Sequence, residues 1–123
     1  MRFEVTREFE AVSQCHCTTC KRISGGTGTV SGVVASDAIE ILEGKELLRT
    51  YQPHEGSAKT FCSVCGSNLF GGGWPESARA SVRLSAIEGD FARRPEAHTF
   101  VRSVAPWETL PEDGAPRYDA ARP

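Results

Sequence analysis

The chain has 123 residues and a formal net charge of −2, from 14 Lys and Arg against 16 Asp and Glu. This length predicts a single domain with a modest core over residues 1–123, and the lack of a cationic surplus argues against a nucleic-acid partner. No apolar run approaches the roughly 20 residues that cross a bilayer, and the opening residues MRFEV do not resemble a secretory signal peptide, so a cytoplasmic protein without a membrane segment is expected.

Twelve glycines and seven prolines favour short strands and turns over long helices. One helical turn is expected at residues 18–23, directly after a strand. Residues 9–12 are expected to pair with the first strand, and residues 108–123 to form an irregular tail. Alternation of apolar and polar residues predicts strands at 3–5, 9–12, 27–34, 39–42, 47–51, 58–61, 68–70, 80–84 and 98–104. The predicted fold class is therefore mainly β, a small antiparallel fold.

All five cysteines lie in two short clusters, one at residues 15–20 and one at residues 62–65. An odd number of cysteines without a signal peptide argues against a disulfide framework. Thiolates two or three residues apart on a turning backbone converge on one ion, and sulfur ligands favour Zn²⁺ at about 2.3 Å. We therefore predict a zinc site that pins the fold. A redox dithiol at Cys62 and Cys65 is the weaker alternative, because the chain lacks the βαβ pattern of thioredoxin-type motifs.

The first cluster carries the chemistry that we expect. Cys15, Cys17 and Cys20 can fill three corners of a tetrahedron and leave a fourth position for a ligand, as in catalytic zinc sites. Three thiolates make such a centre anionic, so it suits an incoming thiol better than a strongly activated hydroxide. The spacing leaves open a second arrangement, in which Cys62 or Cys65 supplies a fourth ligand and closes a structural site.

Four titratable residues outside the cysteines are candidates for a functional role. His16 stands between two predicted ligands and cannot readily face the same ion, so a surface position or one behind the ligands is expected. His98 alternates with Phe100 and is expected to pack against the sheet. Lys21 and Arg22 follow the last cysteine, where they would either attract a carboxylate-bearing ligand or remain solvated.

Four motifs in a fixed order resemble the glutathione-dependent formaldehyde-activating enzyme family, which also includes centromere protein V. The motifs are CHCTTCKRISGG at 15–26, TFCSVCGSNLF at 60–70, HTFV at 98–101 and APW at 105–107. The similarity runs from about Arg2 to Tyr118. Each motif alone is short, and their combination is what makes the resemblance specific.

This resemblance implies a β-rich, Mss4-like fold that binds two zinc ions. It implies that Cys15, Cys17 and Cys20 hold a zinc with an open position, and that Cys62 and Cys65 hold half of a structural zinc. The implied activity is a carbon–sulfur lyase reaction on S-hydroxymethylglutathione, the adduct of glutathione with formaldehyde, so the partner would be a small-molecule thiol or thiol adduct. The alternative is a non-catalytic, zinc-stabilised binding module, since a fold does not fix a function.

The chain departs from the family pattern at its start. Family members carry a further Cys-x-Cys followed by Gly on a strand before the first cluster, and this pair completes the structural site. Here Met1 opens the strand that would follow that pair. We therefore expect either a start further upstream or one bound zinc in place of two, because two thiolates rarely hold zinc tightly.

Overall fold

The structure is a computed structural model that describes residues 1–123. It contains one α-helix, nine strands and four short 3₁₀ turns. The strands are β1 (Arg2–Val5), β2 (Ala11–Cys15), β3 (Thr29–Ala35), β4 (Ile39–Glu43), β5 (Leu48–Tyr51), β6 (Lys59–Cys62), β7 (Asn68–Gly71), β8 (Arg79–Arg83) and β9 (His98–Thr99). The helix is α1 (Thr18–Ser24), and the 3₁₀ turns are Ser36–Ala38, Lys45–Leu47, Leu84–Ala86 and Val101–Ser103. No helix is long and apolar enough to cross a membrane.

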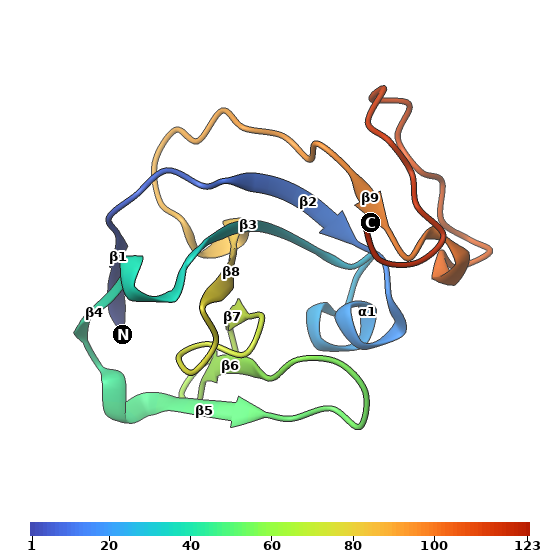
Figure 1. The fold of residues 1–123 in the computed structure, drawn as a ribbon. Helices are drawn as coiled ribbons and strands as arrows, with labels where there is room; N and C mark the ends of the chain where they lie inside the picture. Colours follow the sequence, from blue (N-terminus) through green and yellow to red (C-terminus); the bar gives the residue numbers. More distant parts are fainter.

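Seven of the strands form one sheet in the order β5-β6-β7-β8-β3-β2-β9, while β1 and β4 form a separate pair. The sheet curves, so that β2 and β3 lie opposite β5, and α1 is found at one end between them (Figure 1). The mainly β prediction is confirmed. The expectation of an antiparallel fold needs one correction, because β9 pairs with β2 in parallel. A parallel neighbour requires a long return connection, here the chain between β8 and β9, which runs beside β2 (Figure 1).

Most predicted elements occur close to their expected places, but one pairing and one length are wrong. The first strand pairs with β4, with Phe3 opposite Ile41, and does not pair with the segment at 9–12. This pairing places the Phe3 ring against Phe70, with ring centroids 4.9 Å apart. The strand predicted at 98–104 ends at Thr99, because Phe100 adopts a left-handed conformation with φ of 56° that breaks the extended backbone.

The hydrophobic core lies between β2, β3, β7 and β8. Val12, Val34, Phe70 and Val82 are at most 1% exposed and form its centre. One glycine is required by packing, because a Cβ at Gly32 would lie 2.4 Å from the Phe9 ring. The core thus holds β2 and β3 firmly side by side, and the end of β2 carries the first cysteine cluster.

Residues beyond Val104 contain no helix or strand, but hydrogen bonds hold them along β9. The His98 amide donates to Pro116 O at 2.8 Å, and the Tyr118 amide donates to His98 O at 2.9 Å. In Figure 1 this part of the chain (orange to red) lies at the end of β2 and β9. It therefore brings residues more than 90 positions later in the sequence toward the first cysteine cluster, as with Glu108 beside His16.

Candidate metal centre

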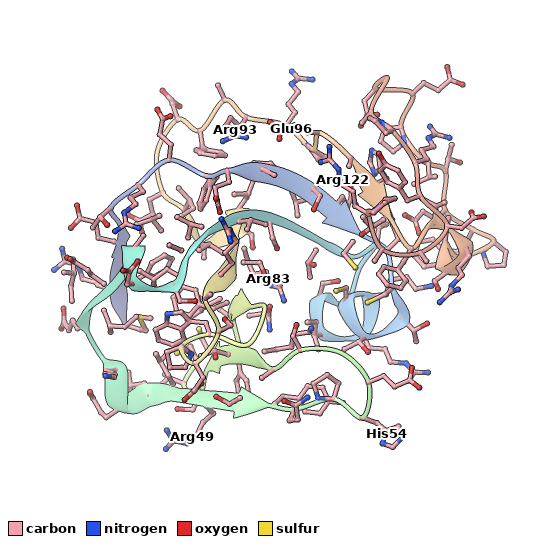
Figure 2. All side chains as sticks on the ribbon, in the orientation of Figure 1. Arg49, His54, Arg83, Arg93, Glu96 and Arg122 are labelled. Atoms are coloured by element: carbon pink, nitrogen blue, oxygen red, sulfur yellow. The ribbon has the colours of Figure 1, made fainter.

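The three cysteines of the first cluster converge where β2 ends and α1 begins. Their Sγ atoms all lie within 4.8 Å of one another. Cys15 is the last residue of β2, Cys17 caps α1, and Cys20 lies in its first turn. Because residues three apart share one face of a helix turn, the Cys20 amide donates to Cys17 Sγ at 3.3 Å. Figure 2 shows sulfur atoms (yellow) gathered at this junction.

A hydrogen bond links two of these thiols, Cys15 and Cys20. The hydrogen bond from Cys20 lowers the pKa of Cys15 to about 7, although burial opposes the shift. The same hydrogen bond, together with burial, raises the pKa of Cys20 above its ordinary value. Cys15 is therefore the thiolate near neutral pH, and Cys20 must release its proton before all three sulfurs can act as metal ligands.

The donor set fits a zinc ion. In a tetrahedral site with Zn–S bonds of about 2.3 Å, sulfur atoms stand about 3.8 Å apart. The observed separations, at most 4.8 Å, need only small side-chain adjustments to reach that value. No further His, Cys, Asp or Glu belongs to the group, so three protein ligands leave the fourth position open. Three thiolates with Zn²⁺ would carry a net charge of −1.

Arg83 supplies a buried positive charge beside the cluster, and we did not predict it from the sequence. Its side chain is 5% exposed and has no carboxylate partner. Burial lowers the pKa of Arg83, whereas the charges of the three cysteines act in the opposite direction. The cysteine charges therefore favour the charged guanidinium, and Arg83 would offset the −1 of a zinc-loaded centre. In Figure 2 the labelled Arg83 side chain extends from β8 toward α1.

Thr29 connects Arg83 to the cluster. Its Oγ1 accepts a hydrogen bond from Arg83 Nη1 at 3.4 Å and also bonds to the Cys20 sulfur. Nη1 donates a second bond, to Ser31 Oγ at 2.7 Å. The sequence held one sign of a buried Arg83, which is that it stands among apolar residues in the strand predicted at 80–84. The alternation of apolar and polar residues, however, predicts that the Arg83 side chain faces solvent.

The two histidines near the cluster are fully buried, each 0% exposed. Of the two positions expected for His16, the surface position is therefore wrong, and the ring lies buried next to the ligands without facing the ion. Its Nδ1 faces Thr27 O at 3.1 Å and Glu108 Oε1 at 3.3 Å, while its Nε2 faces His98 Nδ1 at 3.0 Å. Both ring nitrogens of His16 are thus occupied, and neither is free for a metal ion. Sequence reasoning also missed Glu108, because it comes from the irregular C-terminal residues.

Lys21 and Arg22, the basic pair after the cluster, have different surroundings. Lys21 Nζ donates to the carbonyl oxygen of Ser103 and so ties α1 to the 3₁₀ turn at Val101–Ser103. Arg22 is exposed and forms no ion pair. Arg83, buried in the sheet, is the arginine whose charge acts on the cysteines.

The second cysteine pair lies apart from the first. Cys62 ends β6 and is buried, whereas Cys65 is exposed in the turn before β7. Cys65 Sγ lies 3.1 Å from Ser67 Oγ, and a hydrogen bond from this hydroxyl to the thiolate is the main cause that lowers the pKa of Cys65. Neither thiol belongs to the three-cysteine group, so the two clusters do not form one closed four-cysteine site. The predicted β6–β7 hairpin around this pair is confirmed.

Comparison with known proteins identifies relatives. The family model described as glutathione-dependent formaldehyde-activating enzyme matches residues 1–103. A curated protein of Halomonas elongata, whose name refers to the same family, is 28% identical over 103 residues, which are 77% of this chain and 64% of that protein. The chain thus spans about 64% of that relative's length. A crystal structure of a Rhodobacter sphaeroides protein matches with a TM-score of 0.57 and 21% identity, covering 73% of this chain and 82% of the other, and supports the fold alone.

Proposed function

Because this chain belongs to the glutathione-dependent formaldehyde-activating enzyme family, we propose that it is a zinc-dependent carbon–sulfur lyase. Its substrate would be the adduct of glutathione or another small thiol with formaldehyde, such as S-hydroxymethylglutathione. The observation that carries the proposal is the convergence of three sulfur atoms within 4.8 Å beside a buried arginine. A closed structural site would use a fourth protein ligand, and this cluster has none.

Cys15, Cys17 and Cys20 would hold the zinc ion. When bound, zinc supplies a Lewis-acid position that favours a thiolate over a thiol. Arg83 offsets the negative charge that a fourth sulfur would add to three thiolates. His16 holds the backbone between Cys15 and Cys17 in place, since both of its ring nitrogens are hydrogen-bonded.

The proposed reaction balances as follows. In the cleavage direction the hydroxyl group of the adduct loses its proton, a carbonyl double bond forms, and the carbon–sulfur bond breaks with its electron pair on sulfur. The products are formaldehyde and a thiolate, and the released proton goes to solvent or to the thiolate. Negative charge accumulates on sulfur as the bond breaks, and the buried guanidinium of Arg83 favours that charge distribution.

The remaining assignments belong to the same proposal. One zinc per chain is proposed at the first cluster. Cys62 and Cys65 would supply two ligands to a second ion only where two more ligands complete the site, as the resemblance to the family implies for a Cys-x-Cys pair. We propose one Mss4-like domain over residues 1–123 and a cytoplasmic setting, where free thiols stay reduced.

The test combines metal content with exchange kinetics. Protein loaded with zinc should accelerate the exchange between S-hydroxymethylglutathione and free glutathione plus formaldehyde, measured by NMR exchange spectroscopy against the uncatalysed rate. Cys17→Ser should lose both zinc and acceleration, while Cys65→Ser should keep both. Full acceleration in metal-free protein would contradict the proposal. X-ray absorption showing four protein sulfurs around the zinc and no lighter ligand would favour a binding module.

A further inference from the structure

Two buried threonines flank Cys15 in the sheet. Thr29 is opposite Cys15 across the β2–β3 pair, and Thr99 is opposite it across the β2–β9 pair. Thr29 is 7% exposed and Thr99 is 9% exposed. Because residues in register on neighbouring strands project from the same face of a sheet, both hydroxyl groups lie on the face that carries the Cys15 thiol. The carbonyl oxygen of Thr99 also accepts a hydrogen bond from the His16 amide at 3.0 Å, which fixes this register beside the cluster.

Each threonine hydroxyl group is hydrogen-bonded to one sulfur of the cluster. Thr99 bonds to the Cys15 sulfur, and Thr29 bonds to the Cys20 sulfur. A hydroxyl group has one proton to donate, and a thiolate can only accept. Thr29 Oγ1 already accepts a hydrogen bond from Arg83 Nη1 at 3.4 Å, so its own proton is free for the sulfur. The two hydroxyl groups therefore act as donors toward deprotonated cysteines.

The third sulfur has a backbone donor, because the Cys20 amide donates to Cys17 Sγ at 3.3 Å. Each of the three sulfurs thus accepts a hydrogen bond from a hydroxyl group or a backbone amide. These donors keep their protons when a metal ion displaces the thiol protons, whereas hydrogen bonds between the thiols are then lost. The chain therefore provides one lasting donor for every sulfur that would hold the zinc ion.

A hydrogen bond to a ligand thiolate draws electron density from the sulfur and makes it a weaker nucleophile. This matters in a site that handles formaldehyde, because thiolates add to aldehydes. In that addition the sulfur electron pair forms the carbon–sulfur bond, the carbonyl electron pair moves to oxygen, and the oxygen takes up a proton. At a ligand cysteine the product would be a neutral sulfur, which binds zinc less well than a thiolate does.

We propose that Thr29 and Thr99 protect the ligand sulfurs from formaldehyde, so that addition takes place at the incoming thiol. The inference rests on the proposed function, since it says which sulfur of the loaded site reacts. An incoming thiolate would not share these protons, because each hydroxyl group is already bonded to a ligand cysteine. The two threonines act through the ligands and need no contact with the substrate, so they are specificity-determining residues.

The test follows alkylation of the zinc-loaded protein by iodoacetamide, without substrate and with zinc in excess. Tandem mass spectrometry of the tryptic peptide 8–21 resolves the three ligand cysteines. Thr99→Val removes the hydroxyl group and nearly keeps the shape. Alkylation of Cys15 should therefore accelerate about fivefold, the factor that one ordinary hydrogen bond is worth, while the rate at Cys20 stays unchanged. Thr29→Val should accelerate Cys20 and leave Cys15 unchanged.

Two controls distinguish the loss of a hydroxyl group from a general loosening of the fold. Thr99→Ser keeps the hydroxyl group and should react like the wild type. Thr60→Val changes another buried threonine, on β6, and should leave all three rates unchanged. Wild-type rates in both Thr99→Val and Thr29→Val, or an equal rise at all three cysteines, would overturn the inference. If one of these two variants does not fold, the other decides, because its effect is expected at a different sulfur.

Formaldehyde gives a second readout that does not depend on catalysis. Incubation with formaldehyde should release zinc faster from Thr99→Val than from the wild type, as measured with a chromogenic chelator. If the protein does not accelerate the exchange of S-hydroxymethylglutathione but both threonine results appear, the proposed function fails and this role of the threonines stands. If the exchange is accelerated but the variants are alkylated and lose zinc at wild-type rates, the inference fails and the proposed function stands.

Discussion

His16 Nε2 lies 3.0 Å from His98 Nδ1, and both imidazole rings are completely buried although 82 positions separate them in the chain. Each outer nitrogen faces acceptors: His16 Nδ1 faces Thr27 O and Glu108, and His98 Nε2 faces Asp113 Oδ2 at 2.8 Å. Both outer nitrogens must therefore carry protons, and the contact between the rings needs one more. Three protons on four nitrogens give the pair one positive charge.

Burial is the main cause that lowers the pKa of His16. The His98 ring lies between His16 on one side and Asp113 on the other. His16, the residue between Cys15 and Cys17, is thus held in place by Glu108 directly and by Asp113 through His98. Both acids come from the irregular C-terminal residues, so this part of the chain helps to position the cysteine cluster.

Replacing His98 by leucine should destabilise the fold. The change leaves His16 Nε2 buried without a partner, and an orphaned buried group of this kind costs about 1–3 kcal/mol. Urea denaturation should show a lower midpoint with an unchanged slope. His54→Leu, at an exposed histidine, should leave the midpoint unchanged. A His98→Leu midpoint equal to that of the wild type would show that the histidine chain does not stabilise the tail.

Asp113 should make stability depend on acid pH. The hydrogen bond from His98 is the main cause that holds the pKa of Asp113 below 3.8. A carboxyl with a lowered folded pKa stabilises the fold above its unfolded pKa, about 3.9, and that stabilisation is lost as the pH falls through the folded value. The difference in melting temperature between wild type and Asp113→Asn should therefore be full at pH 6 and shrink below about pH 4. A difference that stays constant down to pH 2 would contradict this account.

Metal retention should depend on the first cluster alone. Cys17→Ser removes one of three ligands, so the protein should lose its zinc, whereas Cys62→Ser should keep it. Native mass spectrometry with a count of reactive thiols is the measurement. Wild-type protein should show one zinc and two free thiols, because five cysteines less three ligands leave two. One zinc with a single free thiol would instead indicate a fourth cysteine ligand.

Gly32→Ala should destabilise the core by about 1–3 kcal/mol, in the range of other overpacking changes. The added Cβ would lie 2.4 Å from the Phe9 ring, so the ring or β3 must shift. Gly26→Ala is the matched control, because the nearest atom to its Cβ is 3.8 Å away. Thermal unfolding of both variants checks the difference, and equal melting temperatures would show that the Phe9 ring yields without cost.

Local features of this protein follow from the sequence by itself. The spacing of Cys15, Cys17 and Cys20 predicts their convergence, because a strand end followed by one helix turn brings neighbours within a few residues onto one face. The β6–β7 hairpin and most strand positions follow from alternation and turn residues in the same way. These features depend on backbone conformations that a short segment sets without help from the rest of the chain.

The tertiary structure decided which distant residues surround the cluster. Arg83 meets Thr29 across 54 positions, and His98 meets His16 across 82. The partner of β1 and the parallel direction of β9 are likewise set by how the whole core closes. A sequence pattern indicates that a residue is polar or apolar, but it does not say which buried charge finds which counter-charge. That choice depends on packing the complete chain, since burying a charge is tolerated only where a partner from another element is already in place.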